Sequence, residues 1–122
     1  MRFGWVLMAL VAGPALADAE LPATGCHVAP NGAHTFLLIE CQVTNTTSEP
    51  VGTLAYSYRA TEEGRSLPWL ESPTWNGPQR ATVPGGIEPG ETVPVLFSAD
   101  LLPERADPVR VEWAFTVAAP AP

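Results

Sequence analysis

The sequence predicts an all-β protein, an antiparallel sandwich of about seven strands. Apolar and polar residues alternate along most of the chain, which is the pattern of strands that bury one face. Turn residues recur about every 8–12 positions, a spacing typical of two packed antiparallel sheets. The 14 prolines agree with this prediction, because proline punctuates loops and protects exposed strand edges.

The first half of the chain predicts three strands. A short strand over 26–29 leads to Asn31-Gly32, a strong hairpin signal because both residues tolerate positive φ. The returning strand ends at residue 44, and the third strand covers 51–61. The apolar residues expected on the buried faces of these two strands are Leu37, Ile39, Cys41 and Val43, then Leu54, Tyr56 and Tyr58.

The second half predicts shorter strands and one long one. Pro68 makes 65–70 an edge strand, because proline cannot donate to a central ladder. Short strands are expected over 80–83 and 92–97, and a regular strand over 109–118. The apolar face of that last strand comprises Val109, Val111, Trp113, Phe115 and Val117.

The two cysteines, Cys26 and Cys41, predict a disulfide, because an even number of cysteines in an exported chain is normally paired. A two-residue turn at Asn31-Gly32 places Cys26 opposite Leu37 rather than Cys41. The bridge therefore requires a register shift, a bulge, or two strands in different sheets.

Residues 1–17 are expected to be a cleaved signal peptide. Arg2 gives a basic start, an apolar run follows, and "ALA" at 15–17 has the small residues of a cleavage site. The run is interrupted by Gly13-Pro14, which leaves it shorter than the roughly 20 apolar residues of a membrane span. We expect one domain over 18–118, a disordered tail over 119–122, and a periplasmic or extracellular location.

The charge of the chain limits its partners. The six basic residues are all arginines and face 13 acidic residues, so the formal net charge is −7. Nucleic acid and anionic membranes require a basic surface, so neither is expected as a partner. Another envelope or secreted protein is the expected partner, and a cationic one fits the charge.

The order of turns and aromatics resembles that of small exported immunoglobulin-like domains of the FxLYD type. The matching positions are Val43, Asn45, Thr47, Tyr56, Tyr58, Gly64, Pro89, Gly90 and Glu91. "YSYRA" stands where the family has its aromatic-x-Leu-Tyr-Asp stretch. The resemblance implies an immunoglobulin-like or fibronectin-III-like sandwich outside the cytoplasm, and it implies no catalytic residue.

The stretch "GGIEPGE" at 85–91 is interpreted as a turn. Pro89 presets φ for the second position of a type II turn, and Gly90 accepts the positive φ of the third. A strand follows instead of a helix, and Glu88 and Glu91 repel anions, so a phosphate-binding loop is not expected.

Two binding sites are weighed as alternatives. In the two-residue hairpin, His27 faces Phe36 and His34 faces Ala29, so both imidazoles lie diagonally on one surface within reach of Zn²⁺ or Cu²⁺. Two surface histidines without a metal are the simpler interpretation, and no cofactor is expected.

The loop "PWLESPTWNGP" offers the second alternative, a glycan- or protein-binding surface. We expect Trp69 to fold into the core, and we expect Trp75, Asn76 and Arg80 to form any binding surface, because tryptophan is a favoured anchor. Catalysis is not expected, since no nucleophile elbow is present and the cysteines are paired. The sequence thus predicts a non-enzymatic interaction or accessory module.

Overall fold

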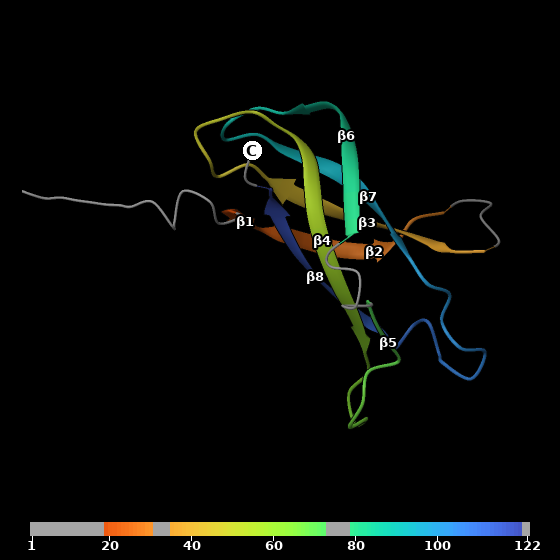
Figure 1. Ribbon diagram of the computed structural model, residues 1–122. Coiled ribbons are helices and arrows are strands. Elements are labelled where there is room, and N and C mark those ends of the chain that lie inside the picture. Colours follow the sequence, from red (N-terminus) through yellow and green to blue (C-terminus); the bar gives the residue numbers. More distant parts are fainter. Residues whose placement is uncertain (1–18, 31–34, 73–78, 121–122) are drawn as a thin grey trace, which may run out of the picture.

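The computed structural model describes residues 19–30, 35–72 and 79–120, and these ranges contain strands and turns but no helix. Eight strands form two antiparallel sheets in this part of the chain (Figure 1), which confirms the all-β sandwich with one strand more than expected.

The larger sheet has the strand order β1-β8-β4-β5, and β6 also pairs with β4. Its strands are β1 (Ala19–Leu21), β4 (Val51–Thr61), β5 (Leu70–Glu71), β6 (Gln79–Ile87) and β8 (Glu112–Ala119). The smaller sheet has the order β2-β3-β7. Its strands are β2 (Ala23–Val28), β3 (Leu37–Thr44) and β7 (Thr92–Ala99).

The core lies between the sheets and follows the predicted alternation. Ile39, Cys41, Val43, Leu54, Phe97 and Val117 are fully buried. Aromatic rings cross the interior: the ring centroids of Tyr56 and Phe97 lie 4.8 Å apart, and those of Phe97 and Phe115 lie 5.1 Å apart. The predicted buried faces of β3 and β4 are therefore confirmed, with Leu37 only partly buried.

The disulfide Cys26–Cys41 is present, and it joins neighbouring strands of the smaller sheet. The pairing of β2 with β3 shifts register between Thr24 and His27, where Gly25 has φ +65°. Of the three solutions that the sequence left open, the structure has the bulge, which places Cys26 opposite Cys41.

The expected two-residue hairpin is wrong. His27 pairs with Glu40 rather than Phe36, and the Ala29 amide donates to the Leu38 carbonyl at 2.8 Å. The connection is longer than two residues, because the buried side chains of β3 and the disulfide set the register instead of the Asn-Gly signal. Residues 31–34 themselves lie outside the described ranges.

The turn interpretation of "GGIEPGE" is confirmed. The Glu91 amide donates to the Glu88 carbonyl at 2.9 Å, and Gly90 has φ +82°, as a type II turn requires. Asn45, which is fully buried, holds this turn through its backbone. Its amide donates to the Glu91 carbonyl at 3.0 Å, and its carbonyl accepts from the Gly90 amide at 2.7 Å.

Both limits of the last strand differ from expectation, and one further strand was not expected. The last strand begins at Glu112 instead of residue 109, because Asp107 caps a turn there and leaves Val109 91% exposed. The strand continues to Ala119, one residue beyond the expected domain end. β1 was not expected, since three residues are too few to show a pattern and only pairing with β8 makes them a strand.

Two strands that pair with β4 in the larger sheet also differ in length from the expected strands. The expected edge strand over 65–70 is reduced to the two residues of β5, which pair with Arg59 and Ala60. Conversely, the strand expected over 80–83 is extended to Ile87 as β6. Its register against β4 shifts between Val51 and Thr53, which accommodates the positive φ of Gly85 and Gly86.

Candidate functional site

The chain changes sheets at Pro22, and this change opens the sandwich at one side. Leu21 pairs with Val117 in the larger sheet, whereas Ala23 pairs with Val43 in the smaller one. β1 therefore covers only the end of β8. In the described part of the chain, residues 112–116 of β8 have β4 on one side and no strand on the other.

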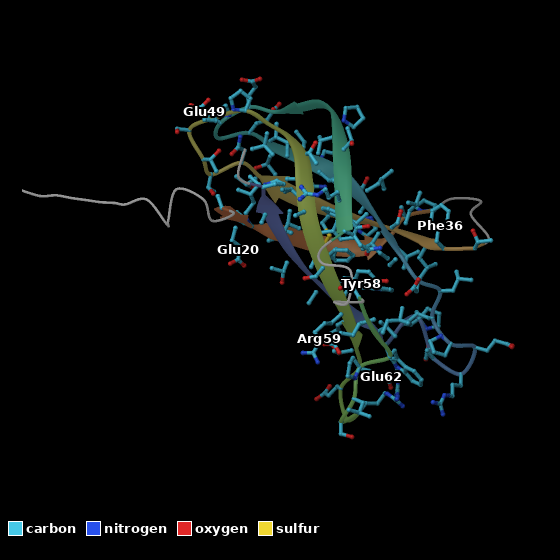
Figure 2. The ribbon with its side chains drawn as sticks, viewed as in Figure 1. Glu20, Phe36, Glu49, Tyr58, Arg59 and Glu62 are labelled. Atoms are coloured by element: carbon cyan, nitrogen blue, oxygen red, sulfur yellow. A yellow bond between two sulfur atoms is a disulfide. The ribbon has the colours of Figure 1, made fainter. Side chains whose placement is uncertain are left out.

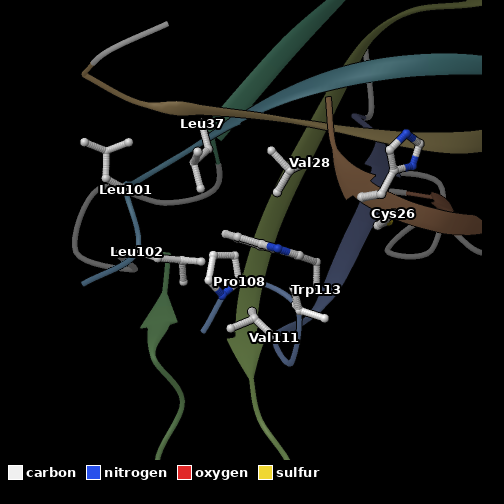
Figure 3. A pocket seen from close by; sticks show the side chains of 10 residues that line it. Cys26, Val28, Leu37, Leu101, Leu102, Pro108, Val111 and Trp113 are labelled. Carbon is white, nitrogen blue, oxygen red and sulfur yellow. The ribbon is translucent and has the colours of Figure 1, made fainter. Parts of the chain in front are cut away.

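An apolar groove of about 590 Å³ lies between this open edge of β8 and β2. Figure 3 shows the Trp113 indole at the centre of the lining side chains, with Val28 on one side and Val111 and Pro108 on the other. The other apolar lining residues are Leu37, Leu101, Leu102 and Val109. We call this feature the groove.

Apolar side chains at the rim of the groove are exposed to solvent. Val28 is 41% exposed, Leu101 46% and Val109 91%. Contiguous exposed apolar side chains around a concavity are typical of a binding surface.

One wall of the groove is the segment 100–111, which is tied to the core at its start. The Asp100 amide donates to the Tyr58 hydroxyl oxygen at 2.9 Å. A turn follows, closed by the Ala106 amide on the Pro103 carbonyl at 2.9 Å. Burial raises the pKa of Tyr58, so its hydroxyl stays protonated and neutral at physiological pH.

The middle of the same segment approaches Trp69, which lies half-buried outside the core cluster and not inside it as expected. Its indole N–H donates to Glu62 at 3.0 Å, and the Arg65 guanidinium lies 3.5 Å over its ring. Arg105, from the groove wall, approaches the same ring at 5.4 Å. These cation–π contacts explain why Trp69 stays at the surface.

A polar hollow adjoins the groove. It is lined by Glu62, Glu63, Glu112, Arg110 and Val109, and Val109 also lines the groove. We call it the acidic cleft. Arg110 reaches the Glu62 carboxylate at 3.7 Å, while Glu63 and Glu112 have no ion-pair partner among the residues that the structure describes.

Of the three binding residues expected from the tryptophan loop, the structure describes only Arg80. Arg80 lies exposed on β6, opposite Ala55, and does not line the groove. Trp75 and Asn76 lie outside the described residues.

His27 lies at the groove, but its ring nitrogens already have partners. Nδ1–H donates to the Gly25 carbonyl at 2.9 Å, and Nε2 lies 3.5 Å from Glu40. Within the ranges 19–30, 35–72 and 79–120, no three His, Cys, Asp or Glu side chains are grouped as metal ligands. His34, the other candidate ligand, falls outside those ranges.

Sequence reasoning missed the groove. Leu101 and Leu102 lie in a segment broken by Pro103, where no strand or helix period marks them as a face, and Val109 was expected on the apolar face of the last strand. The apolar character of the two leucines outside any expected strand was the available signal.

No family model, curated protein or solved structure matches this chain. None of its described segments is a helix long and apolar enough to cross a membrane. The fold and the site define a disulfide-bonded two-sheet β domain with an apolar groove beside an acidic cleft.

Proposed function

We propose that this protein is a non-enzymatic, exported, immunoglobulin-like interaction module that binds another envelope or secreted protein in the groove. The observation that carries the proposal is the apolar groove at an open strand edge, on a framework held by a disulfide. Recognition surfaces of this kind are placed at the rim of rigid sandwiches.

Three features support export and the fold family. The Cys26–Cys41 bridge is stable in oxidising compartments, and residues 1–17 have the pattern of a signal peptide. Asn45 and the turn at 88–91, which belong to the FxLYD resemblance, form one hydrogen-bonded unit.

The lining of the groove supports binding more than catalysis. Cys26 is oxidised, and His27 is the one lining residue with an ionisable side chain. The remaining lining side chains are aliphatic or aromatic, a composition suited to burying a partner's apolar residues.

Site-specific photo-crosslinking in living cells tests this function. Benzoylphenylalanine in place of Val109 is expected to trap one defined protein, whereas the same probe in place of Leu67, which is 70% exposed outside the groove, is not. The trapped protein, once purified, should bind the unmodified chain at least about tenfold more tightly than a Val28→Asp variant. Equal trapping at both positions, or none at Val109, would overturn the proposal.

A further inference from the structure

We infer that the groove and the acidic cleft together form one bipartite site for an extended peptide segment that carries apolar side chains followed by lysine or arginine. This inference rests on the proposed function and adds the chemistry of the partner. Its first support is position, because Val109 lines both hollows, which therefore adjoin each other.

The open edge of β8 favours an extended segment. Residues 112–116 span about 17 Å at the usual rise of a strand. Antiparallel ladders leave alternate N–H and C=O groups of an edge strand directed outward, where a partner strand pairs with them. Trp113 lines the groove from this edge, so a strand added beside β8 directs every second side chain into the same apolar space.

The negative charge of the acidic cleft favours a basic residue at one end of the bound segment. Three carboxylates, from Glu62, Glu63 and Glu112, face one guanidinium from Arg110. The cleft lies where β8 begins, so an antiparallel partner strand reaches it with its C-terminal end. A basic residue there gains charge-assisted hydrogen bonds in a site that repels anions.

The same charges disfavour two other occupants. A second copy of this chain would bring two acidic clefts together between molecules that each have a formal charge of −7. Like charges at such an interface oppose association. A fatty acid or another anionic amphiphile would be repelled wherever its carboxylate approaches the acidic cleft.

Calorimetry with synthetic peptides tests the inference, using protein purified from expression of the full-length chain. The probe is acetyl-Thr-Val-Leu-Val-Thr-Lys-Lys-amide, and the comparison peptide has Glu-Glu in place of Lys-Lys. We expect the probe to bind about tenfold more tightly than its comparison, and the difference to shrink as salt rises from about 50 mM to about 500 mM.

Matched variants locate the site. The double change Glu63→Gln and Glu112→Gln should weaken the Lys-Lys probe about five- to tenfold, because two partner charges are lost. The control double change Glu20→Gln and Glu49→Gln removes the same charge at a distance from Glu62 (Figure 2) and should leave affinity unchanged. A Val28→Ser variant should weaken both peptides, whereas Leu96→Ser, 50% exposed on β7, should weaken neither.

Hydrogen exchange by NMR tests strand addition separately, since alternate amides over 112–116 should become protected when the probe binds. Equal affinity for both peptides, unchanged exchange at β8, preferential binding of a fatty acid, or a dimer that the probe dissociates would each overturn the inference. If Val109 traps a partner but the Lys-Lys probe does not bind, this inference fails and the proposed function stands. If Val109 traps nothing, the proposed function fails.

Discussion

The Tyr56 hydroxyl donates a hydrogen bond of 2.9 Å to the Ser98 carbonyl and thereby joins β4 of one sheet to β7 of the other. Tyr58 lies two residues after Tyr56 on β4, and Asp100 directly follows the end of β7. The Asp100 amide donates to the Tyr58 hydroxyl oxygen, also at 2.9 Å. The first bond spans the core, and the second sets the start of the groove wall. The position of the groove wall thus depends on Tyr58, whereas Tyr56 joins the two sheets.

A Tyr58→Phe change should loosen the groove wall. It removes the acceptor of the Asp100 amide, and we expect a loss of about 1 kcal/mol in the free energy of unfolding. Amides of 101–109 should exchange faster by NMR. The matched Tyr56→Phe change should lower stability by a similar amount while leaving that segment protected, and equal loosening in both variants would contradict this account.

The two tyrosines, which are the only ones in the chain, should lose their protons at a higher pH in the folded protein than in the unfolded chain. Burial raises the pKa of both hydroxyls above the ordinary value of 10.0. The resulting stability is fully present below pH 10 and is lost as pH rises through the higher folded pKa values, because the unfolded chain releases these protons first. Absorbance at the tyrosinate band should show a higher midpoint for folded protein than for protein in concentrated urea. Coincident midpoints would be contrary to this prediction.

Removal of the disulfide should destabilise the fold. The bridge closes a separation of 15 residues, and a loop of this length corresponds to about 3 kcal/mol in chain-entropy terms. The double change Cys26→Ala and Cys41→Ala should therefore lower the urea midpoint. Reductant should lower the midpoint of the unmodified protein and leave that of the double variant unchanged; a midpoint insensitive to reductant in both would disprove the role of the bridge.

Asn45→Ala should be among the more damaging single changes. The side-chain amide of this fully buried residue donates to the carbonyls of Glu49 and Ile87 at 2.8 and 2.9 Å, and its oxygen accepts from Thr47. Loss of these bonds leaves buried polar groups unpaired, and we expect destabilisation of about 2–3 kcal/mol by urea unfolding. The neighbouring exposed residue offers a control, since Thr46→Ala should change stability by less than about 0.5 kcal/mol.

The leader should be removed on export. Cleavage after Ala17 leaves β1, which begins at Ala19, intact for pairing with β8. Intact-mass measurement of the protein recovered from outside the cytoplasm should correspond to residues 18–122. An uncleaved mass in that fraction would contradict the expected signal peptide.

Much of the strand content was predictable from the sequence, because side-chain alternation is a local property of a strand. The buried faces around Ile39, Leu54 and Phe97 follow directly from a period of two. The turn at Pro89-Gly90 was predictable for the same local reason, since its φ values are intrinsic to those residue types.

Pairing partners and edges were not predictable in this way, because they depend on contacts between distant segments. The Asn31-Gly32 signal gave the wrong register for β2, since the buried side chains of β3 and the disulfide outweigh a local turn preference. Trp69 stays half-buried outside the core because Glu62 accepts its indole N–H and two arginines lie over its ring.

By itself, the sequence determined where most of the strands lie, which side of β3 and β4 is apolar, and that two cysteines pair. Only the tertiary structure decided that the chain changes sheets at Pro22, so that among the described residues no strand lies beside one edge of 112–116, where the groove forms. The physical reason is that the alternation of a strand depends on residues next to one another in the sequence. An open edge depends instead on which strands pair with each other in the folded protein.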